Sequence, residues 1–293
     1  YSIVSSNLEG GSRVAPETAK RQGKRGATVG KNTSRHAVSA AAFGALALMG
    51  ASPALAQQCP GSGTITGPRT TTCTLGNNDN LTIESGGSIM VTGAGVDALV
   101  VSAATTVTIQ NNGTLSTNAV GIRIAGNVLS LTNSGTVTTT GFYGIFITAG
   151  NIGSINNSGL LTSSYTGLNN QGGVIGTITN ASGGEIGGSS ANYGILNGLD
   201  IDTINNEHGA SIRGNFDAIN SYVEDALTIN NAGSITGNVV SAGPATINIQ
   251  GEHSSIAGNV ENPNGSVNVL SGALFALRGL LVQAGRPALG MAA

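Results

Sequence analysis

Short runs of alternating apolar and polar residues recur along the chain and predict β-strands rather than helices. The clearest run opens with an aliphatic residue and continues through asparagine to glycine, as in Ile229-Asn230-Asn231-Ala232-Gly233. The aliphatic residues that open the successive copies are Ile83, Ile109, Leu131, Ile155, Ile178, Ile204, Ile229 and Ile249. They lie 26, 22, 24, 23, 26, 25 and 20 residues apart, a period typical of a repeat architecture.

A second motif keeps the same period. It reads "VDALVV", "AVGIRI", "FYGIFI", "YTGLNN", "NYGILN" and "FDAINS". Its small residues are Ala98, Gly121, Gly144, Gly167, Gly194 and Ala218, at spacings of 23, 23, 23, 27 and 24. Two landmarks in phase indicate that residues 81–273 form one array.

Each repeat holds three short β-type runs separated by glycine and asparagine, which predicts a right-handed parallel β-helix of seven or eight coils. Helical solenoids have longer periods and a 3.6-residue pattern. A leucine-rich repeat would need a Leu-x-x-Leu-x-Leu frame, which is missing. Stacked hairpins are the closest rival, because Asn-Gly is a strong hairpin signal. In most copies, however, a residue separates the asparagine from the glycine.

The asparagine of the first motif falls where the chain must turn. Asparagine tolerates left-handed dihedral angles and can bond its own backbone, and stacked asparagines can form side-chain ladders between coils. The residues expected in this structural role are Asn111, Asn133, Asn157, Asn180, Asn206 and Asn231.

Composition separates a basic head from an acidic body. All three lysines and four arginines lie in the first 36 residues, whereas the chain after Ala56 has five arginines against twelve carboxylates. Charged residues make up only 9% of the chain, Gly accounts for 46 residues and Trp is absent. A lysine-free acidic body argues against nucleic acid as a partner, because phosphates are neutralised by clustered cations.

The head has the pattern of a secretory signal peptide. An apolar run at 37–49 follows the basic residues, and "SPALA" at 52–56 provides small residues for cleavage between Ala56 and Gln57. The apolar run is too short for the ~20 residues of a membrane span. Residues 1–56 are therefore expected to be a cleaved, helical leader, and the fold class is all-β apart from it.

The leader is longer than usual, and its first part carries "YSIV" at 1–4, "VAPETAK" at 14–20 and "RQGKR" at 21–25. These elements, in this order, resemble the extended signal peptide region of autotransporters and two-partner secretion proteins. Together with the Gly- and Asn-rich repeats of 57–273, they resemble an autotransporter passenger domain. The resemblance implies export to the periplasm and then to the cell surface, outer membrane or medium. It implies contact with the outer membrane only through a C-terminal β-barrel, a segment outside these residues.

Two cysteines, Cys59 and Cys73, follow the cleavage site. An even number of cysteines in an exported chain favours a disulfide. Such a bond would crosslink residues 57–80, which are expected to form an N-terminal cap. After the repeats, residues 274–293 lose the pattern and are expected to form an irregular tail, either a poorly formed cap or the product of a truncated or shifted reading frame.

Three carboxylates form the best candidate for a cation or catalytic site. Asp200 and Asp225 each lie four residues before the opening isoleucine of successive repeats, and Asp202 lies two residues after Asp200. Carboxylates this close repel one another unless a cation relieves them. The group is interpreted as a solubilising acidic edge, with Ca²⁺ binding as an option; no other cofactor is expected. The nearest basic residue in sequence is Arg213.

Aromatic residues gather around the second motif. They are Phe142, Tyr143, Tyr165, Tyr193 and Phe216, with Tyr222 after them. The repeat register places Phe142, Tyr165 and Phe216 at one corner position. Such rings can pack under the corner or form a platform for sugars or a partner, and packing is the preferred reading.

The function expected from these features is non-enzymatic adhesion or self-aggregation, with a host surface, other cells or a second copy of the chain as partner. A Gly-Asp-Ser-Gly protease element is missing, and His208 and His253 are read as solvated surface residues. The alternative is a β-helical polysaccharide lyase or hydrolase that uses Asp200, Asp202 and Asp225. Fold alone does not decide between these functions.

Overall fold

The computed structural model describes residues 3–4, 13–14, 57–59, 63–102, 106–273 and 276–282. The chain divides into two units, Tyr1–Gly50 and Ala51–Ala293. In the first unit, strands β1 (Ile3–Val4) and β2 (Arg13–Val14) pair antiparallel. The rest of the predicted helical leader, including Ala56 at the cleavage site, lies outside the described residues. No helix among the described residues is long and apolar enough to span a membrane.

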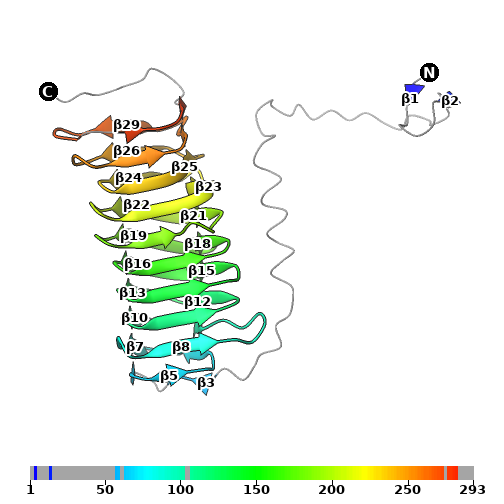
Figure 1. The fold of residues 1–293 in the computed structure, drawn as a ribbon, viewed down its shortest axis with the longest axis vertical. Helices are drawn as coiled ribbons and strands as arrows, with labels where there is room; N and C mark the ends of the chain where they lie inside the picture. Colours follow the sequence, from blue (N-terminus) through cyan, green and yellow to red (C-terminus); the bar gives the residue numbers. More distant parts are fainter. Residues whose placement is uncertain are drawn as a thin grey trace. The chain divides into compact units, whose positions relative to one another are not determined.

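The second unit is a parallel β-solenoid in which three faces repeat along the axis (Figure 1). Face 1 is a sheet of ten strands. It consists of β4 (Gly63–Ile65), β7 (Asn80–Ile83), β10 (Val107–Asn111), β13 (Val128–Asn133), β16 (Gly150–Asn157), β19 (Gly173–Asn180), β22 (Asp200–Asn206), β24 (Leu227–Asn231), β26 (Ala245–Ile249) and β29 (Ser266–Val269). Ten strands stacked in parallel correspond to about nine turns.

A second sheet, of 19 strands, forms the other two faces. Face 2 contains β5 (Pro68–Arg69), β8 (Ser88–Val91), β11 (Thr114–Thr117), β14 (Thr136–Thr139), β17 (Leu160–Ser163), β20 (Glu185–Gly187), β27 (Ser255–Ala257) and β30 (Ala276–Leu277). Face 3 contains β3 (Gln57–Gln58), β6 (Cys73–Leu75), β9 (Leu99–Val101), β12 (Val120–Ile124), β15 (Tyr143–Ile147), β18 (Thr166–Asn170), β21 (Tyr193–Asn197), β28 (Val260–Glu261) and β31 (Leu281–Val282). Two long strands, β23 (Ser211–Ser221) and β25 (Ser234–Ser241), run through the corner and join both faces.

The predicted all-β parallel helix is confirmed, but it has more turns than the seven or eight expected. The additional turns arise because residues 57–80, which lack the asparagine motif, also form strands: β4 pairs with β7, and β5 with β8. At the other end, β30 and β31 pair with β27 and β28. Strands pair here through backbone hydrogen bonds and through aliphatic side chains that point into the core. Pairing therefore does not require the asparagine motif.

Aliphatic side chains stacked coil upon coil form the core. On face 1 the opening aliphatics of the first motif, such as Ile155, Ile178 and Ile204, are fully buried. Face 2 adds a column that includes Leu161 and Ile212, and face 3 adds one that includes Ile145 and Ile195. Each such side chain contributes ~1.5–3 kcal/mol by leaving water. Buried and partly exposed residues alternate along most strands, so the polar residues between the aliphatic ones lie on the outer surface.

The small residues of the second motif are explained by close packing between coils. A Cβ on Gly144 would lie 2.6 Å from the carbonyl oxygen of Gly167 and 2.7 Å from Leu161 Cδ1. Side chains on face 2 therefore reach under this corner of face 3, and a larger residue has no room.

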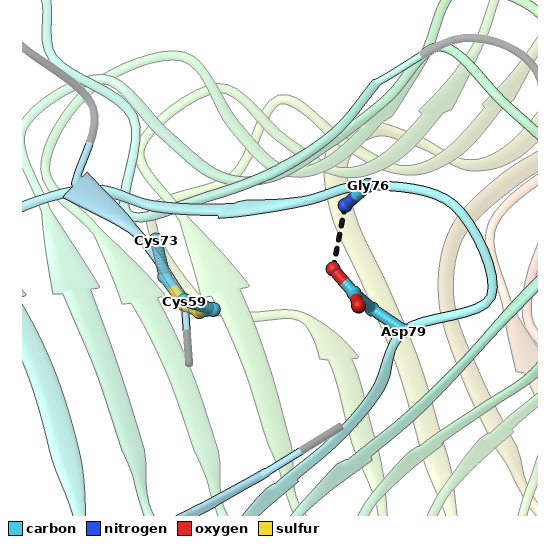
Figure 2. The surroundings of a disulfide bond; sticks show 4 residues. All are labelled: Cys59, Cys73, Gly76 and Asp79. Atoms are coloured by element: carbon cyan, nitrogen blue, oxygen red, sulfur yellow. Dashed lines mark hydrogen bonds between the residues drawn. A yellow bond between two sulfur atoms is a disulfide. The ribbon is translucent and has the colours of Figure 1, made fainter. Parts of the chain in front are cut away.

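Cys59 and Cys73 form a disulfide in the first coils, with their Cα atoms 5.0 Å apart (Figure 2). This separation lies within the usual range for a bridged pair. Both residues are buried in the core cluster. A turn follows on the same segment, where the Gly76 amide donates to Asp79 Oδ2 at 2.8 Å. Gln57, on the mature side of the predicted cleavage site, lies in β3 and pairs with Cys73.

Candidate functional site

Six asparagines at the ends of successive face 1 strands form a continuous ladder inside the rod. In each step the Nδ2 of one asparagine donates to the Oδ1 of the next. The ladder runs Asn111, Asn133, Asn157, Asn180, Asn206 and Asn231, with distances of 2.7, 2.7, 2.8, 3.0 and 2.8 Å. These are the six residues singled out in the sequence, and the structure brings all of them together.

Each ladder amide also binds the backbone of the next coil. Asn133 Nδ2 donates to the Leu160 carbonyl at 3.2 Å, and Asn180 Nδ2 donates to the Ser211 carbonyl at 2.9 Å. The ladder side chains are at most 1% exposed. A ligand cannot reach amides that are buried and bonded in this way. The ladder therefore holds the corner between faces 1 and 2 and stacks the coils.

A second, shorter ladder lies at the corner between faces 3 and 1. Asn170 Nδ2 donates to Asn197 Oδ1 at 3.0 Å, and Asn197 Nδ2 donates to Ser221 Oγ at 3.1 Å. The sequence interpretation did not assign these residues. A signal was present, because "YTGLNN", "NYGILN" and "FDAINS" each end on an asparagine or serine at the same repeat position.

The predicted aromatic residues form one strip on the outer surface of face 3. Ring centres of consecutive members lie 6.0–6.2 Å apart from Phe142 through Tyr143, Tyr165 and Tyr193 to Phe216. Phe146, which the sequence interpretation did not include, lies 4.6 Å from Tyr143. Most of the contacts between coils are edge-to-face, the geometry that aromatic rings favour when they pack.

Exposure divides the strip into packed and accessible rings. Phe146 is 9% exposed, whereas Phe142 and Phe216 are 43% and 58% exposed. Burial raises the pKa of Tyr165 to about 12, with the neighbouring tyrosines adding to the rise. It also raises the pKa of Tyr143, Tyr193 and Tyr222. The hydroxyls thus stay neutral and serve as hydrogen-bonding groups well above neutral pH.

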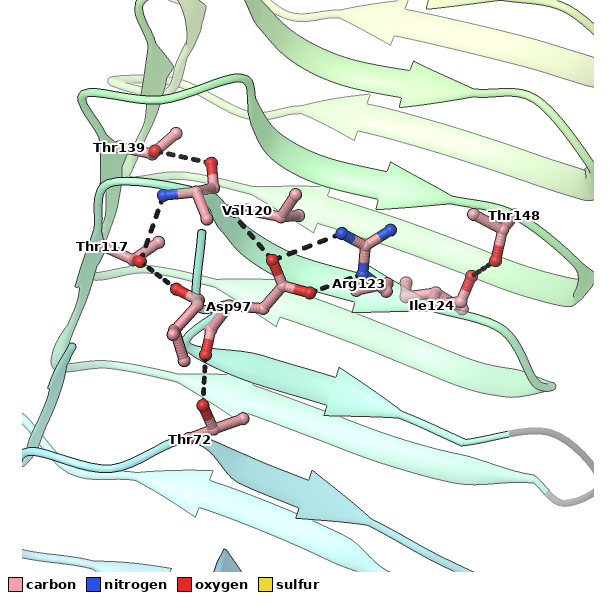
Figure 3. Close-up of polar contacts among 10 residues, drawn as sticks. Thr72, Asp97, Thr117, Val120, Arg123, Ile124, Thr139 and Thr148 are labelled. Carbon is pink, nitrogen blue, oxygen red and sulfur yellow. Dashed lines mark hydrogen bonds and ion pairs between the residues drawn. The ribbon is translucent and has the colours of Figure 1, made fainter. Parts of the chain in front are cut away.

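A polar cluster borders the N-terminal end of the strip (Figure 3). Arg123 pairs with Asp97 through its Nε, and its guanidinium lies 5.2 Å from the centre of the Phe146 ring. Asp97 also accepts from the Val120 amide at 3.2 Å. In Figure 3 the Arg123 and Asp97 side chains point toward each other beside strand β12. The cluster fixes the loop before β9 against the next coil.

The acidic group is close enough for its members to interact. Burial raises the pKa of Asp200, and the charges of Asp202 and Asp225 raise it further. Among the residues that the structure describes, however, no three His, Cys, Asp or Glu side chains come together as metal ligands. Arg213 is engaged elsewhere, donating to Ser211 at 2.9 Å and lying 3.9 Å from Glu185. The structure thus brings the three predicted carboxylates near one another, and their role stays a prediction.

Comparison of the chain with protein-family models, curated proteins and solved structures gave no match.

The outer surface of face 1 carries regular columns of uncharged polar side chains beside the carboxylates of Asp200 and Asp202 in β22. Two columns of side chains run along it, and every member is a hydroxyl or a carboxamide. One column is Asn80, Thr108, Ser130, Ser154, Thr177, Thr203, Thr228, Thr246 and Ser266. The other is Thr64, Thr82, Gln110, Thr132, Asn156, Thr179, Asn205, Asn230, Asn248 and Asn268.

Part of the second column is itself a hydrogen-bonded ladder. Asn230 Nδ2 donates to Asn205 Oδ1 at 2.8 Å, Asn248 to Asn230 at 2.8 Å and Asn268 to Asn248 at 3.0 Å. Unlike the inner ladder, these amides are partly exposed. Their remaining lone pairs and hydrogens can therefore bond to groups outside the rod.

Proposed function

We propose that this protein is a non-enzymatic passenger of the autotransporter type that self-associates through the outer surface of face 1. Self-association between copies on neighbouring cells would produce aggregation or adhesion. Export to the cell surface or the medium is part of the proposal and is supported by the leader-like residues 1–56.

The observation that carries the proposal is the pair of uncharged columns on face 1. Neither column contains a charged residue, so charge repulsion between the columns does not oppose the approach of a second rod. Side chains repeat every ~4.8 Å along a β-rod, so two rods can align many donors and acceptors at once. Each bond contributes only ~0.5–1.5 kcal/mol net, and the number of rungs provides the affinity.

Charge placed on face 1 tests the proposal. The double variant Thr179→Lys/Asn230→Lys adds two cations to the uncharged columns. Its matched control is Ser116→Lys/Thr236→Lys, which adds the same charge to outer positions of face 2. Sedimentation velocity should show concentration-dependent assembly of the wild type and the control, and monomers of the face 1 variant. Circular dichroism should confirm that all three proteins are folded.

Two outcomes would contradict the proposal. One is a wild type that stays monomeric at every concentration, and the other is an equal loss of assembly in both lysine variants. The latter would mean that net charge matters and face 1 does not.

A polysaccharide-active enzyme is the second candidate, because the raised pKa of Asp200 would suit a general acid. Cleavage of acidic and neutral polysaccharides by the wild type, abolished in Asp200→Asn, would establish that activity. Equal and negligible cleavage by the wild type and by Asp200→Asn would rule out the enzyme as a candidate function.

A further inference from the structure

We propose that His208 and His253 form a binding site for one divalent transition-metal ion of the imidazole-preferring class, such as Zn²⁺, Ni²⁺ or Cu²⁺. The two histidines are 45 positions apart in the chain, and each follows a glutamate, as Glu207-His208 and Glu252-His253. The structure places their ring centres 5.4 Å apart.

Loop length explains how the two rings meet. The corner between faces 1 and 2 is formed by residues 207–210 after β22, by 232–233 after β24 and by 250–254 after β26. His208 and His253 lie in the two long loops, which flank the short one. Two coils separate the loops by about 9.6 Å along the axis, and the side chains close that gap above the small residue Ala232.

The separation of the rings fits coordination of a single ion. Two imidazoles bound to one tetrahedral metal at about 2.0–2.1 Å have ring centres roughly 5 Å apart. The rings here are 5.4 Å apart and tilted by 48°, a separation of ring centres that matches this geometry. Both histidines are exposed, and an ion can therefore approach from solvent.

The surroundings leave space for the remaining ligands. His208 borders an open hollow of about 540 Å³, which Asn230, Ala232 and Gln250 also line. In the described part of the chain no third His, Cys, Asp or Glu joins the pair. Water would fill the other positions, as it does at zinc sites that have an open coordination position.

Binding would connect coils that are not neighbours. The ion would join the corner after β22 to the corner after β26 and span the intervening coil. Since metal bound only by the folded rod stabilises it, loading should tighten this C-terminal part of the solenoid.

Titration of the full chain with Zn²⁺ by isothermal calorimetry tests the site. We expect one ion per chain and at least a tenfold loss of affinity in His208→Ala and in His253→Ala. In the full chain with its leader retained, His36→Ala is the matched control, because it removes the third histidine of the sequence, and it should bind as the wild type does. With Cu²⁺, electron paramagnetic resonance should report two nitrogen ligands, reduced to one in either single variant.

Several results would overturn the site. These are unchanged affinity in either His208→Ala or His253→Ala, loss of binding in His36→Ala, or one ion per two chains. Because both side chains are exposed, the variants should fold, and circular dichroism verifies this.

Discussion

The side chains of Asn133 and Asn157, which are 24 residues apart in the sequence, share a hydrogen bond of 2.7 Å inside the rod. The same amide of Asn133 also binds the Leu160 carbonyl at 3.2 Å. One side chain therefore holds its own corner, the next asparagine and the next coil. The arrangement repeats at each step of the ladder, so the effect of a substitution should depend on whether its residue is a rung.

Replacing a rung should be costly. Asn157→Ala removes the acceptor of Asn133 Nδ2 and the donor to Asn180 Oδ1. An unsatisfied buried polar group costs about 1–3 kcal/mol, so we expect a loss of about 2–5 kcal/mol in the free energy of unfolding, measured with urea. Asn156→Ala, on the outer surface of the same strand, is the control and should change stability by less than about 0.5 kcal/mol. Equal losses in the two variants would contradict the structural role of the ladder.

A methyl group at the second-motif glycine should also destabilise the rod. In Gly144→Ala the new Cβ would press on the Gly167 carbonyl oxygen and on Leu161. Overpacking of this kind costs about 1–3 kcal/mol. Gly67→Ala is the control, because nothing lies within 4 Å of a Cβ at that position. If thermal unfolding shows the same midpoint for both variants, the coils are less tightly packed at this corner than the structure indicates.

The aromatic strip predicts loss of stability at alkaline pH. The pKa of Tyr165 is about 12 in the folded protein, against an ordinary value of 10.0. The folded state therefore keeps this proton while the unfolded state releases it, so stability falls as pH rises from about 10 to about 12. Ultraviolet titration of tyrosinate should reveal a late-ionising component that Tyr165→Phe removes. That variant should also unfold at a higher pH than the wild type, and an unchanged titration curve would refute the assignment.

Removing a carboxylate from the group of Asp200, Asp202 and Asp225 should stabilise the protein. Because the pKa of Asp200 is raised, the folded state binds its proton more tightly than the unfolded state does, and stability declines as pH rises through that interval. Asp225→Asn removes one cause of the rise. We expect a higher melting temperature than the wild type at about pH 7 and a smaller difference in acid, where Asp200 takes up its proton. The increase should be small because Asp200 is only partly buried and solvent screens its interactions with the neighbouring charges.

Glu84→Gln makes the same change of charge far from this group and serves as the control. A similar increase in melting temperature for Glu84→Gln would attribute the effect to net charge. In that case the local repulsion around Asp200 would not be its cause.

Periodicity was sufficient to predict the solenoid and the residues of the inner ladder. Once Ile155 and Ile178 occupy equivalent core positions, the asparagine two residues after each must occupy equivalent corners. The same argument placed Asp200 near Asp225. These inferences succeed because parallel stacking converts a sequence period directly into spatial proximity.

The features that sequence did not predict depend on corner loops and on how far side chains reach. His208 and His253 lie two coils apart and meet only because the loop between them is short. Arg123 and Asp97 pair across a corner whose geometry no period specifies. The first coil was not predicted because its strands, β4 to β6, lack the asparagine motif, although they pair with the next coil and bury Ile65 and Leu75 in the core.

The Asn ladder also determines how a rod of this kind can change in length during evolution. Residues 134–157 make up one coil that receives a hydrogen bond from Asn133 and passes an equivalent one to Asn180. A duplicated or deleted coil would leave every remaining rung with a partner. A single residue inserted within a strand would instead shift the register by one, so that polar side chains of the outer surface would point into the core. Growth by whole coils, in steps of about 4.8 Å, is therefore the change that the interior tolerates.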